Sequence, residues 1–267
     1  MASATGDGLR RATGGLFVVG ALAFGAAATV LSSTFNWPDI LREPASVVLP
    51  AFVDGGTSLV WVWFATAWTY AILAVPILLL PSVLGRRDDP VLQAATYVGA
   101  TSVVLSLTGF LRWVFVVPPL AHAYVTGDAT ATAAVDAAWM AQHQFGGALL
   151  GEHLGELLGI GWSITLCVII LRSRVLPRWL GVTGLVVSVL YLLNQGDILA
   201  TAVPGFPVWD LAGLIGSTSW GLWVAALGLV ILLRPVRHPS RSTGDTGATL
   251  STGTRPGTWP DSAGPRS

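Results

Sequence analysis

The sequence contains no lysine, a single cysteine and few charged residues of any kind. Without a lysine amine, Schiff-base chemistry is excluded. With Cys167 alone, the chain cannot form an internal disulfide bond. Charged residues make up 10% of the chain, against about 25% in typical soluble domains, so a large soluble globule is also excluded. The formal net charge is +0, which gives no reason to expect nucleic acid as a partner.

Apolar residues are abundant instead, at 53% of the chain. Six apolar stretches reach the roughly 20 residues that a helix needs to cross the hydrocarbon core of a bilayer. The first is too long for the apolar region of a signal peptide. The sequence therefore predicts an all-α integral membrane bundle of about six transmembrane helices within residues 10–234. The stretches cover residues 13–33, 57–80, 92–117, 146–171, 178–198 and 209–233.

The arginines predict the orientation of this bundle in the cell membrane. If both termini are cytoplasmic, twelve of the fourteen arginines fall on the cytoplasmic side, as the positive-inside rule requires. Only Arg42 and Arg112 then lie on the outer side. The segment 235–267 is rich in Pro, Ser, Thr and Gly, and we expect a disordered cytoplasmic tail there.

The outer connections, residues 34–56 and 118–145, are the longer ones. Within the second, residues 129–145 are rich in alanine and favour a helix. This helix either lies on the membrane surface or extends the fourth span outward.

Small residues recur every fourth position in the fourth span, at Gly147, Gly151, Gly155 and Gly159, and continue to Ser163 and Cys167. Such a ridge lets a neighbouring helix approach closely, and ordinary helix packing is its simplest role. The sixth span has a similar ridge and is the predicted neighbour. Its small residues are Gly213, Ser217, Gly221 and Ala225.

The same segment carries Glu152, His153 and Glu156. Spacings of three and four residues place these side chains within reach of one another on a helix. An unpaired charge in a membrane span costs roughly 2.5–3.5 kcal/mol, so partners are expected. Arg112 in the third span is the predicted counter-ion. Further polar groups at a similar depth are Asn194, Gln195, Asp197, Ser217, Thr218 and Ser219.

Three interpretations of this polar layer remain open. It is a set of structural ion pairs, a hydrated cavity in which a carboxylate or His153 exchanges protons, or a metal site. The metal site would use His122, His143 and His153 with a glutamate. The order His153-x-x-Glu156 is the reverse of the Glu-x-x-His element of di-iron bundles, and no metal is predicted.

Tryptophan is frequent, with twelve residues. Most of those near the outer side fit an aromatic belt at the membrane interface; they are Trp37, Trp61, Trp63, Trp113, Trp139 and Trp209. The deeper residues Trp68, Trp162, Trp220 and Trp223 are candidates for the walls of a lipophilic pocket.

Residues 171–184 (LRSRVLPRWLGVTG), preceded by 151–155 (GEHLG), resemble a family of prokaryotic multi-pass membrane proteins known only as domain of unknown function 4386. The motif RRATG at 10–14 also fits this family. The resemblance covers residues 10–234 and implies the helical bundle and its orientation. It implies no activity.

The leading functional hypothesis is a protein that binds or acts on a small lipophilic molecule in an outward-facing polar cavity. As an enzyme it would be a cofactor-independent acid–base catalyst, for example in proton-initiated isoprenoid cyclisation, with Glu152 or Glu156 as acid and His153 as base or orienting group. No cofactor fingerprint is present. The alternatives are a structural or accessory membrane protein and a proton-coupled carrier, and the oligomeric state stays open. The predicted binding residues are Arg112, Trp162, Asn194, Asp197, Trp220 and Trp223.

Overall fold

Helices account for the regular secondary structure of the computed structural model, which describes residues 2–233 and the side chains from residue 6 onward. The all-α part of the fold prediction is confirmed. The tail predicted at residues 235–267 lies outside the described residues.

Twelve helical elements follow one another along the described chain. Two of them are not α-helices: η1 is a 3₁₀ helix and η2 is a π-helix. The elements are α1 (Ala2–Phe35), η1 (Asp39–Arg42), α2 (Ala45–Ala71), α3 (Ala74–Val83), α4 (Pro90–Phe115), α5 (Val117–Thr126), α6 (Ala129–Gln142), η2 (His143–Leu154), α7 (Gly155–Ser173), α8 (Arg178–Leu192), α9 (Gln195–Ala200) and α10 (Ala212–Leu233).

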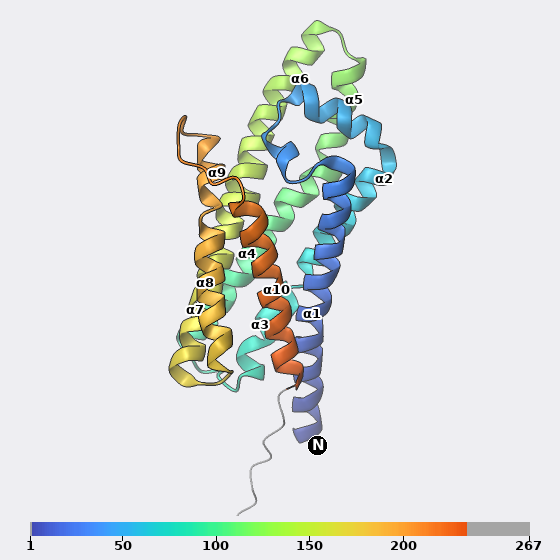
Figure 1. Ribbon diagram of the computed structural model, residues 1–267. Helices are drawn as coiled ribbons and strands as arrows, with labels where there is room; N and C mark the ends of the chain where they lie inside the picture. The colour runs from blue at the N-terminus through green and yellow to red at the C-terminus, as the bar shows by residue number, and fades with distance from the viewer. Residues whose placement is uncertain (1, 234–267) are drawn as a thin grey trace, which may run out of the picture. The chain divides into compact units, whose positions relative to one another are not determined.

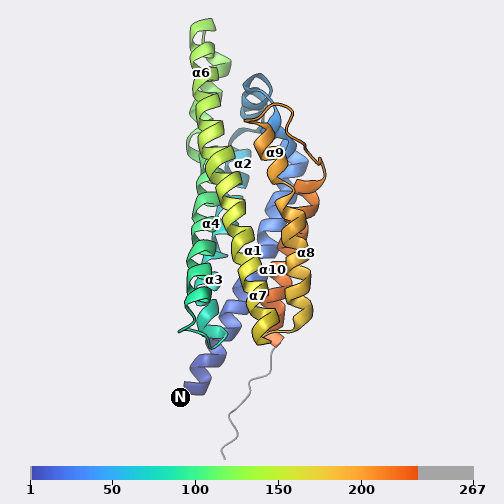
Figure 2. The same cartoon turned by 90° about the vertical axis from the view of Figure 1, so that its left-hand side faces the viewer.

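The long helices form a closed ring within this part of the chain. Neighbours in the ring follow the order α1, α2, α4, α7, α8 and α10, and α10 packs on α1 again (Figures 1 and 2). Arg10 fastens this closure, because its Nη1 donates to the carbonyl oxygens of Ile231 and Leu232 in the last turn of α10. Consecutive spans are therefore neighbours in space.

Two ends of this ring can be distinguished. The basic end holds the start of α1, the end of α10 and the turns α3–α4 and α7–α8 (Figure 1). The distal end holds η1, α5, α6 and α9. Both ends of the described chain lie at the basic end, as the predicted topology requires for an even number of spans.

Six helical segments of the described chain are long and apolar enough to cross a membrane, as predicted. The outside of the ring exposes large apolar side chains, for example Leu22 (59% exposed) and Leu222 (64% exposed). A soluble protein rarely exposes such a surface, whereas lipid covers it favourably. The chain is thus a multi-pass helical membrane protein.

The second and third spans differ from the prediction because they are longer. Residues 34–56 are not simply a loop, since α2 begins at Ala45. It is broken at Gly56, whose positive φ of 59° interrupts the helix where the apolar span was predicted to begin. Residues 118–145 fold into the helical hairpin α5–α6, and α6 runs through η2 into α7. Of the two alternatives for residues 129–145, outward extension of the fourth span is correct.

Local sequence signals end and begin the helices at the basic end. Asp89 caps α4 by accepting hydrogen bonds from the backbone amides of Val91 and Leu92, and Pro90 occupies the first turn. α7 ends at Arg174, which adopts the left-handed conformation, and Pro177 precedes α8. The motif at residues 171–184 is therefore a turn between two spans.

The glycine ridge packs against α4, so the prediction of a sixth-span neighbour is wrong. A Cβ on Gly109 of α4 would lie 2.7 Å from the Cα of Gly151. The hydroxyls of Ser106 and Ser102 continue this contact, because they donate to the carbonyl oxygens of Gly151 and Gly155. Gly151, Gly155 and Gly159 face Gly109, Ser106 and Ser102 of α4 in turn, whereas α10 packs with its own glycines on α1 and α8.

Aromatic side chains fill the distal half of the ring. Trp63 and Trp113 stack with ring centroids 4.7 Å apart, and Phe35 packs edge-on against both. Trp63 and Trp113 are fully buried and Trp139 is 5% exposed, so these three are core residues and not part of an interfacial belt. Trp61 and Trp209 are exposed and fit the belt.

We expect the exchange Gly151→Ala to destabilise the bundle by about 1–3 kcal/mol, because the new methyl group must push against the backbone of Gly109. Gly161→Ala in α7 is the matched control, since a Cβ there meets nothing within 4 Å. Thermal unfolding of the two detergent-purified variants measures the difference. Equal melting temperatures would contradict the assignment of this contact.

Candidate functional site

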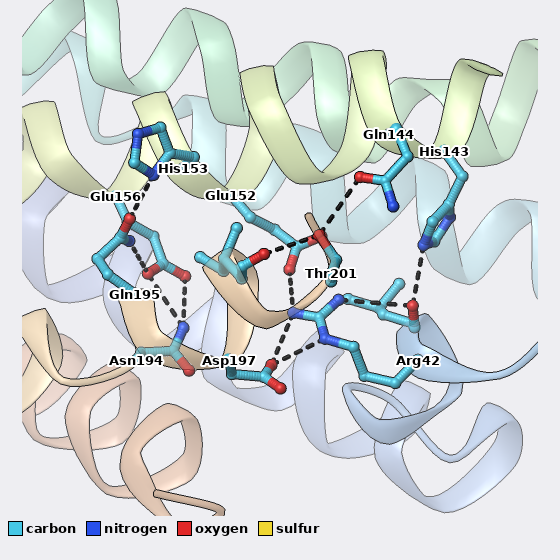
Figure 3. A network of polar contacts seen from close by, with 12 residues as sticks. Arg42, His143, Gln144, Glu152, His153, Glu156, Asn194, Gln195, Asp197 and Thr201 are labelled. Carbon is cyan, nitrogen blue, oxygen red and sulfur yellow. Dashed lines mark hydrogen bonds and ion pairs between the residues drawn. The ribbon is translucent and has the colours of Figure 1, made fainter. Parts of the chain in front are cut away.

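The polar side chains of η2 and the start of α7 point away from α4, toward η1 and α9 at the distal end (Figure 3). The ridge of glycines is packed against α4, so the remaining face of the same helix is free to meet the outer segments. η2 itself is a π-helix of 12 residues, a form that usually occurs as a single turn and often at functional sites.

Arg42 of η1 is the cation of this site. Its Nη2 lies 2.7 Å from Glu152 Oε2 and 2.7 Å from Asp197 Oδ2, so one guanidinium joins the fourth and fifth spans (Figure 3). Burial by itself would lower the pKa of Arg42, but the two carboxylates outweigh burial and raise it. Arg42 therefore remains charged and holds both carboxylates in place.

The predicted counter-ion Arg112 has a different role, which corrects the sequence-based assignment. Its Nη1 donates to the carbonyl oxygen of His143 at 3.1 Å, and its guanidinium lies 5.3 Å from the centroid of the Trp113 ring. The space for this guanidinium comes from Gly147, where a Cβ would collide with it. Arg112 thus braces α4 against the start of η2.

Glu156 is held by amides. The Asn194 side-chain amide donates to both carboxyl oxygens at 3.0 Å, and Gln195 Nε2 donates to Oε2 at 2.9 Å (Figure 3). Among the described residues no ion pair joins Glu156 to a cation. The three carboxyl groups of the site therefore fall into two kinds: Glu152 and Asp197 on Arg42, and Glu156 between amides.

His153 reaches Glu156 only through Gln195. His153 Nδ1 lies 2.7 Å from Gln195 Oε1, and because an amide oxygen accepts only, this nitrogen carries the proton. The same glutamine donates to Glu156 through its nitrogen. The predicted proximity of His153 and Glu156 thus takes the form of a relay, His153 to Gln195 to Glu156.

Two phenols complete the surroundings of Glu156. Tyr191 of α8 and Tyr70 of α2 both lie within electrostatic range of this carboxyl group. Trp220 packs on both rings, with centroid separations of 6.5 Å to Tyr70 and 6.2 Å to Tyr191. Among the deep tryptophans, Trp220 is therefore the one that supports the site, and it does so through these phenols.

Of the other predicted aromatic walls, Trp162 and Trp223 lie in the core, whereas Trp68 is 49% exposed on the outside of the ring. Trp162 is 1% exposed and packs against Phe17, while Trp223 is 4% exposed and donates through Nε1 to the carbonyl oxygen of Leu180. Trp220 donates to Ser163 Oγ. These contacts occupy the space between α1, α7, α8 and α10, and they give Trp162 and Trp223 a packing role.

The three histidines of the metal hypothesis do not come together. His143 stacks on Trp139, and its Nε2 bonds to the carbonyl oxygen of Leu41. His153 bonds to Gln195, and His122 lies on the exposed surface of α5. Within the described residues there is no group of three His, Cys, Asp or Glu side chains placed to share a metal ion.

Several buried polar atoms around the start of η2 have no protein partner within the described residues. An unpartnered buried polar group is costly, so these atoms mark places where water or a bound molecule completes the hydrogen bonding. They are Arg112 Nε, Gln142 Nε2, Gln142 Oε1, His143 Nδ1 and Glu152 Oε1.

Comparison with known proteins agrees with the resemblance drawn from the turn motif. A family model described as "Domain of unknown function (DUF4386)" matches residues 12–228. The chain belongs to the DUF4386 family. No curated protein and no solved structure matches it. Because the match runs from α1 into α10, the polar cluster lies wholly inside the DUF4386 domain.

Three site residues of this DUF4386 protein were missed by sequence reasoning: Arg42, Tyr70 and Tyr191. Arg42 carried a signal, because the predicted topology left only two arginines on the outer side and the unused one was Arg42. Because Arg42 was predicted to lie in a loop, its contact with the fourth span was not expected. The contact arises because η1 folds back over the ends of the spans. Tyr70 carried no signal beyond its position in an apolar span.

The arrangement allows Glu156 to gain or lose a proton without disturbing an ion pair. The Asn194 amide can turn and present either its nitrogen or its oxygen, so it can hold the carboxyl group in both protonation states, while Gln195 keeps the orientation that His153 fixes. Protonation of Glu152 or Asp197 would instead remove one of the two ion pairs of Arg42. Glu156 is thus the carboxyl group of the site whose bonds in the described part of the chain come from amides and not from Arg42.

We expect Arg42→Gln to destabilise the distal end by about 1–2 kcal/mol, because two carboxylates lose their shared cation. The double variant Arg42→Gln/Glu152→Gln should lose less than the sum of the single variants. Arg87→Gln, at the basic end, is the control. Thermal unfolding in detergent provides the numbers, and strict additivity of the two changes would refute the pairing.

Proposed function

We propose that this DUF4386 protein binds the polar end of a small lipophilic molecule at the distal polar cluster and exchanges a proton with it through Glu156. The observation that carries the proposal is the division of the carboxyl groups: Glu152 and Asp197 pair with Arg42, whereas amides hold Glu156. Two carboxyl groups in different surroundings are the usual basis of an acid–base site.

Access from the distal end supports binding at this cluster. The side chains of Arg42 and Asp197 are 27% and 34% exposed, and those of Glu152 and Arg42 lie side by side at this opening. Glu156 and His153 are partly buried, deeper along the same helix. A molecule that entered from the outer leaflet would meet the ion pairs first and the amide-held carboxyl group next.

In this proposal each residue has its own part. Glu156 touches the molecule and gives or takes the proton. Asn194 and Gln195 hold that carboxyl group, and His153 fixes the orientation of Gln195 from the far side. Arg42 holds Glu152 and Asp197 in place through its ion pairs. Either an enzyme of the acid–base type or a binding protein would use this set in the same way.

A proton-coupled carrier is less well supported. A carrier needs polar groups that continue from the distal cluster to the basic end. Toward the basic end, buried hydroxyls such as Thr96, Ser188 and Thr13 donate to carbonyl oxygens four residues earlier in their own helices. These hydroxyls are hydrogen-bonded within their own helices and are therefore poorly placed to transfer a proton from one helix to the next.

Glu156→Gln should leave the protein folded but reduce its content of co-purified lipophilic molecules, because an amide keeps hydrogen bonds and cannot exchange the proton. The interaction that is lost is the one between the Glu156 carboxyl group and the bound molecule. The loss of one good hydrogen bond corresponds to about 3- to 10-fold weaker binding. Organic extracts of the purified variant and of wild type, compared by mass spectrometry at equal protein amount, measure the loss. Equal amounts of the same lipophilic molecules in both extracts would contradict the proposal.

A lipophilic carbodiimide gives an independent test on the wild-type protein. This reagent needs a carboxyl group that can become protonated in apolar surroundings, so it should modify Glu156, which amides hold, and spare Glu152, which is paired with Arg42. Peptide mass spectrometry locates the adduct. Equal modification of both glutamates would contradict their assigned difference.

The orientation with both termini cytoplasmic belongs to the same proposal, because it places the cluster on the outside. The buried Cys167 is replaced by Ala, and single cysteines are introduced as Thr130→Cys near the tip of the α5–α6 hairpin or Asp88→Cys in the α3–α4 turn. A membrane-impermeant maleimide applied to intact cells should label the first and not the second. The reverse pattern would invert the topology.

A further inference from the structure

A groove runs along the lipid-facing side of α4 and α7, near the basic end and away from the polar cluster. Its first part has a volume of about 480 Å³ and is lined mainly by apolar and small side chains. These two helices are neighbours over their length (Figure 2). The lining residues are Pro90, Val91, Ala94, Ala95, Val98, Gly161 and Thr165.

Small residues create this groove. Ala94 and Ala95 leave a shallow surface on α4, and Gly161 faces them from α7, where a Cβ would meet nothing within 4 Å. Glycines 151, 155 and 159 of the same helical run contact α4 closely, whereas Gly161 does not. The absence of a side chain at Gly161 therefore serves no helix contact and leaves room beside the backbone.

The groove ends in a polar pocket. A second cavity of about 210 Å³ shares Val91 and Thr165 with the first, and it adds Arg86, Asp89 and Arg172 to the lining. Arg86 is paired with Asp89 at 2.9 Å. Within the described residues no acidic side chain is paired with Arg172, so the pocket has one positive charge in excess.

We propose that this groove binds one anionic phospholipid of the cytoplasmic leaflet. An acyl chain lies along Ala94 and Gly161, and the phosphate lies at Arg172 with Arg86 beside it. Arginine is well suited to phosphate because its guanidinium offers several donors in a fixed geometry. The leaflet fits as well, since anionic lipids are concentrated on the cytoplasmic side, where the positive-inside rule places this end.

The occupant is a phospholipid and not free phosphate, because the charged pocket continues without interruption into the apolar one. A soluble anion would leave about 480 Å³ of apolar groove unused. A neutral phospholipid has the same acyl chains, but its headgroup carries a cation that would face Arg172. The charge of the pocket therefore favours a headgroup with a net negative charge.

The test compares phosphatidylglycerol with phosphatidylcholine of the same chain length, added to full-length protein and followed by native mass spectrometry. Wild type should retain phosphatidylglycerol preferentially. Arg172→Gln should weaken this binding about tenfold, the value of one charge-assisted hydrogen bond to phosphate. Arg178→Gln, an exposed arginine at the same end but outside the groove, is the matched control and should behave like wild type.

A second variant tests the apolar part. Gly161→Leu fills the groove without touching a helix contact, so it should reduce binding of both lipids. Inorganic phosphate in excess should not displace bound phosphatidylglycerol. Equal retention of the two lipids by wild type, equal losses in Arg172→Gln and Arg178→Gln, or displacement by phosphate would each overturn the proposal. None of these outcomes bears on Glu156.

Discussion

The close approach of two backbones at Gly109 and Gly151 is the contact on which the arrangement of polar groups depends. Lipid gives no hydrophobic drive for helices to associate, so backbone contact and interhelical hydrogen bonds must hold them together. Here Ser102 and Ser106 add such hydrogen bonds beside the glycine contact. Once this face of η2 and α7 is packed against α4, the acidic residues of the same helix have to face the opposite way.

The opposite face meets two short segments. η1 supplies Arg42, and the start of α9 with the residue before it supplies Gln195 and Asn194. Both segments reach the polar end of the fourth span. The cluster is therefore built where the spans end, at a depth where water can complete the hydrogen bonding of its unpartnered atoms. That position lowers the cost of keeping five ionisable groups together, Arg42, Glu152, His153, Glu156 and Asp197.

The two ends of the ring differ in how their charged side chains are paired. At the distal end, opposite charges neutralise one another around Arg42, and Glu156 is left to amides. At the basic end, the second cavity is lined by Arg86, which pairs with Asp89, and by Arg172, which has no acidic partner among the described residues. The long apolar middle separates them, and buried hydroxyls such as Thr96 and Ser188 there donate to carbonyl oxygens of their own helices.

Much of this protein follows from one-dimensional properties of the sequence. The number of spans, the family resemblance and the position of the polar residues along the fourth span required only hydropathy, a turn motif and spacing, because each helix satisfies its own backbone in lipid. The sequence did not predict which helix packs against which. The glycine ridge fitted the small residues of α10 as well as those of α4, and spacing alone cannot choose between them.

The cluster shows the same limit. Sequence named Glu152, His153, Glu156, Asn194 and Asp197, because ionisable residues in apolar segments are conspicuous. It assigned the cation to Arg112, the arginine inside a span, whereas the fold places the loop residue Arg42 on the carboxylates and turns Arg112 toward His143. Depth in the membrane is encoded by position along the chain. Which side chains pair with one another depends on how the loops fold back and on how each helix is oriented about its own axis. Both depend on the packing of the whole ring.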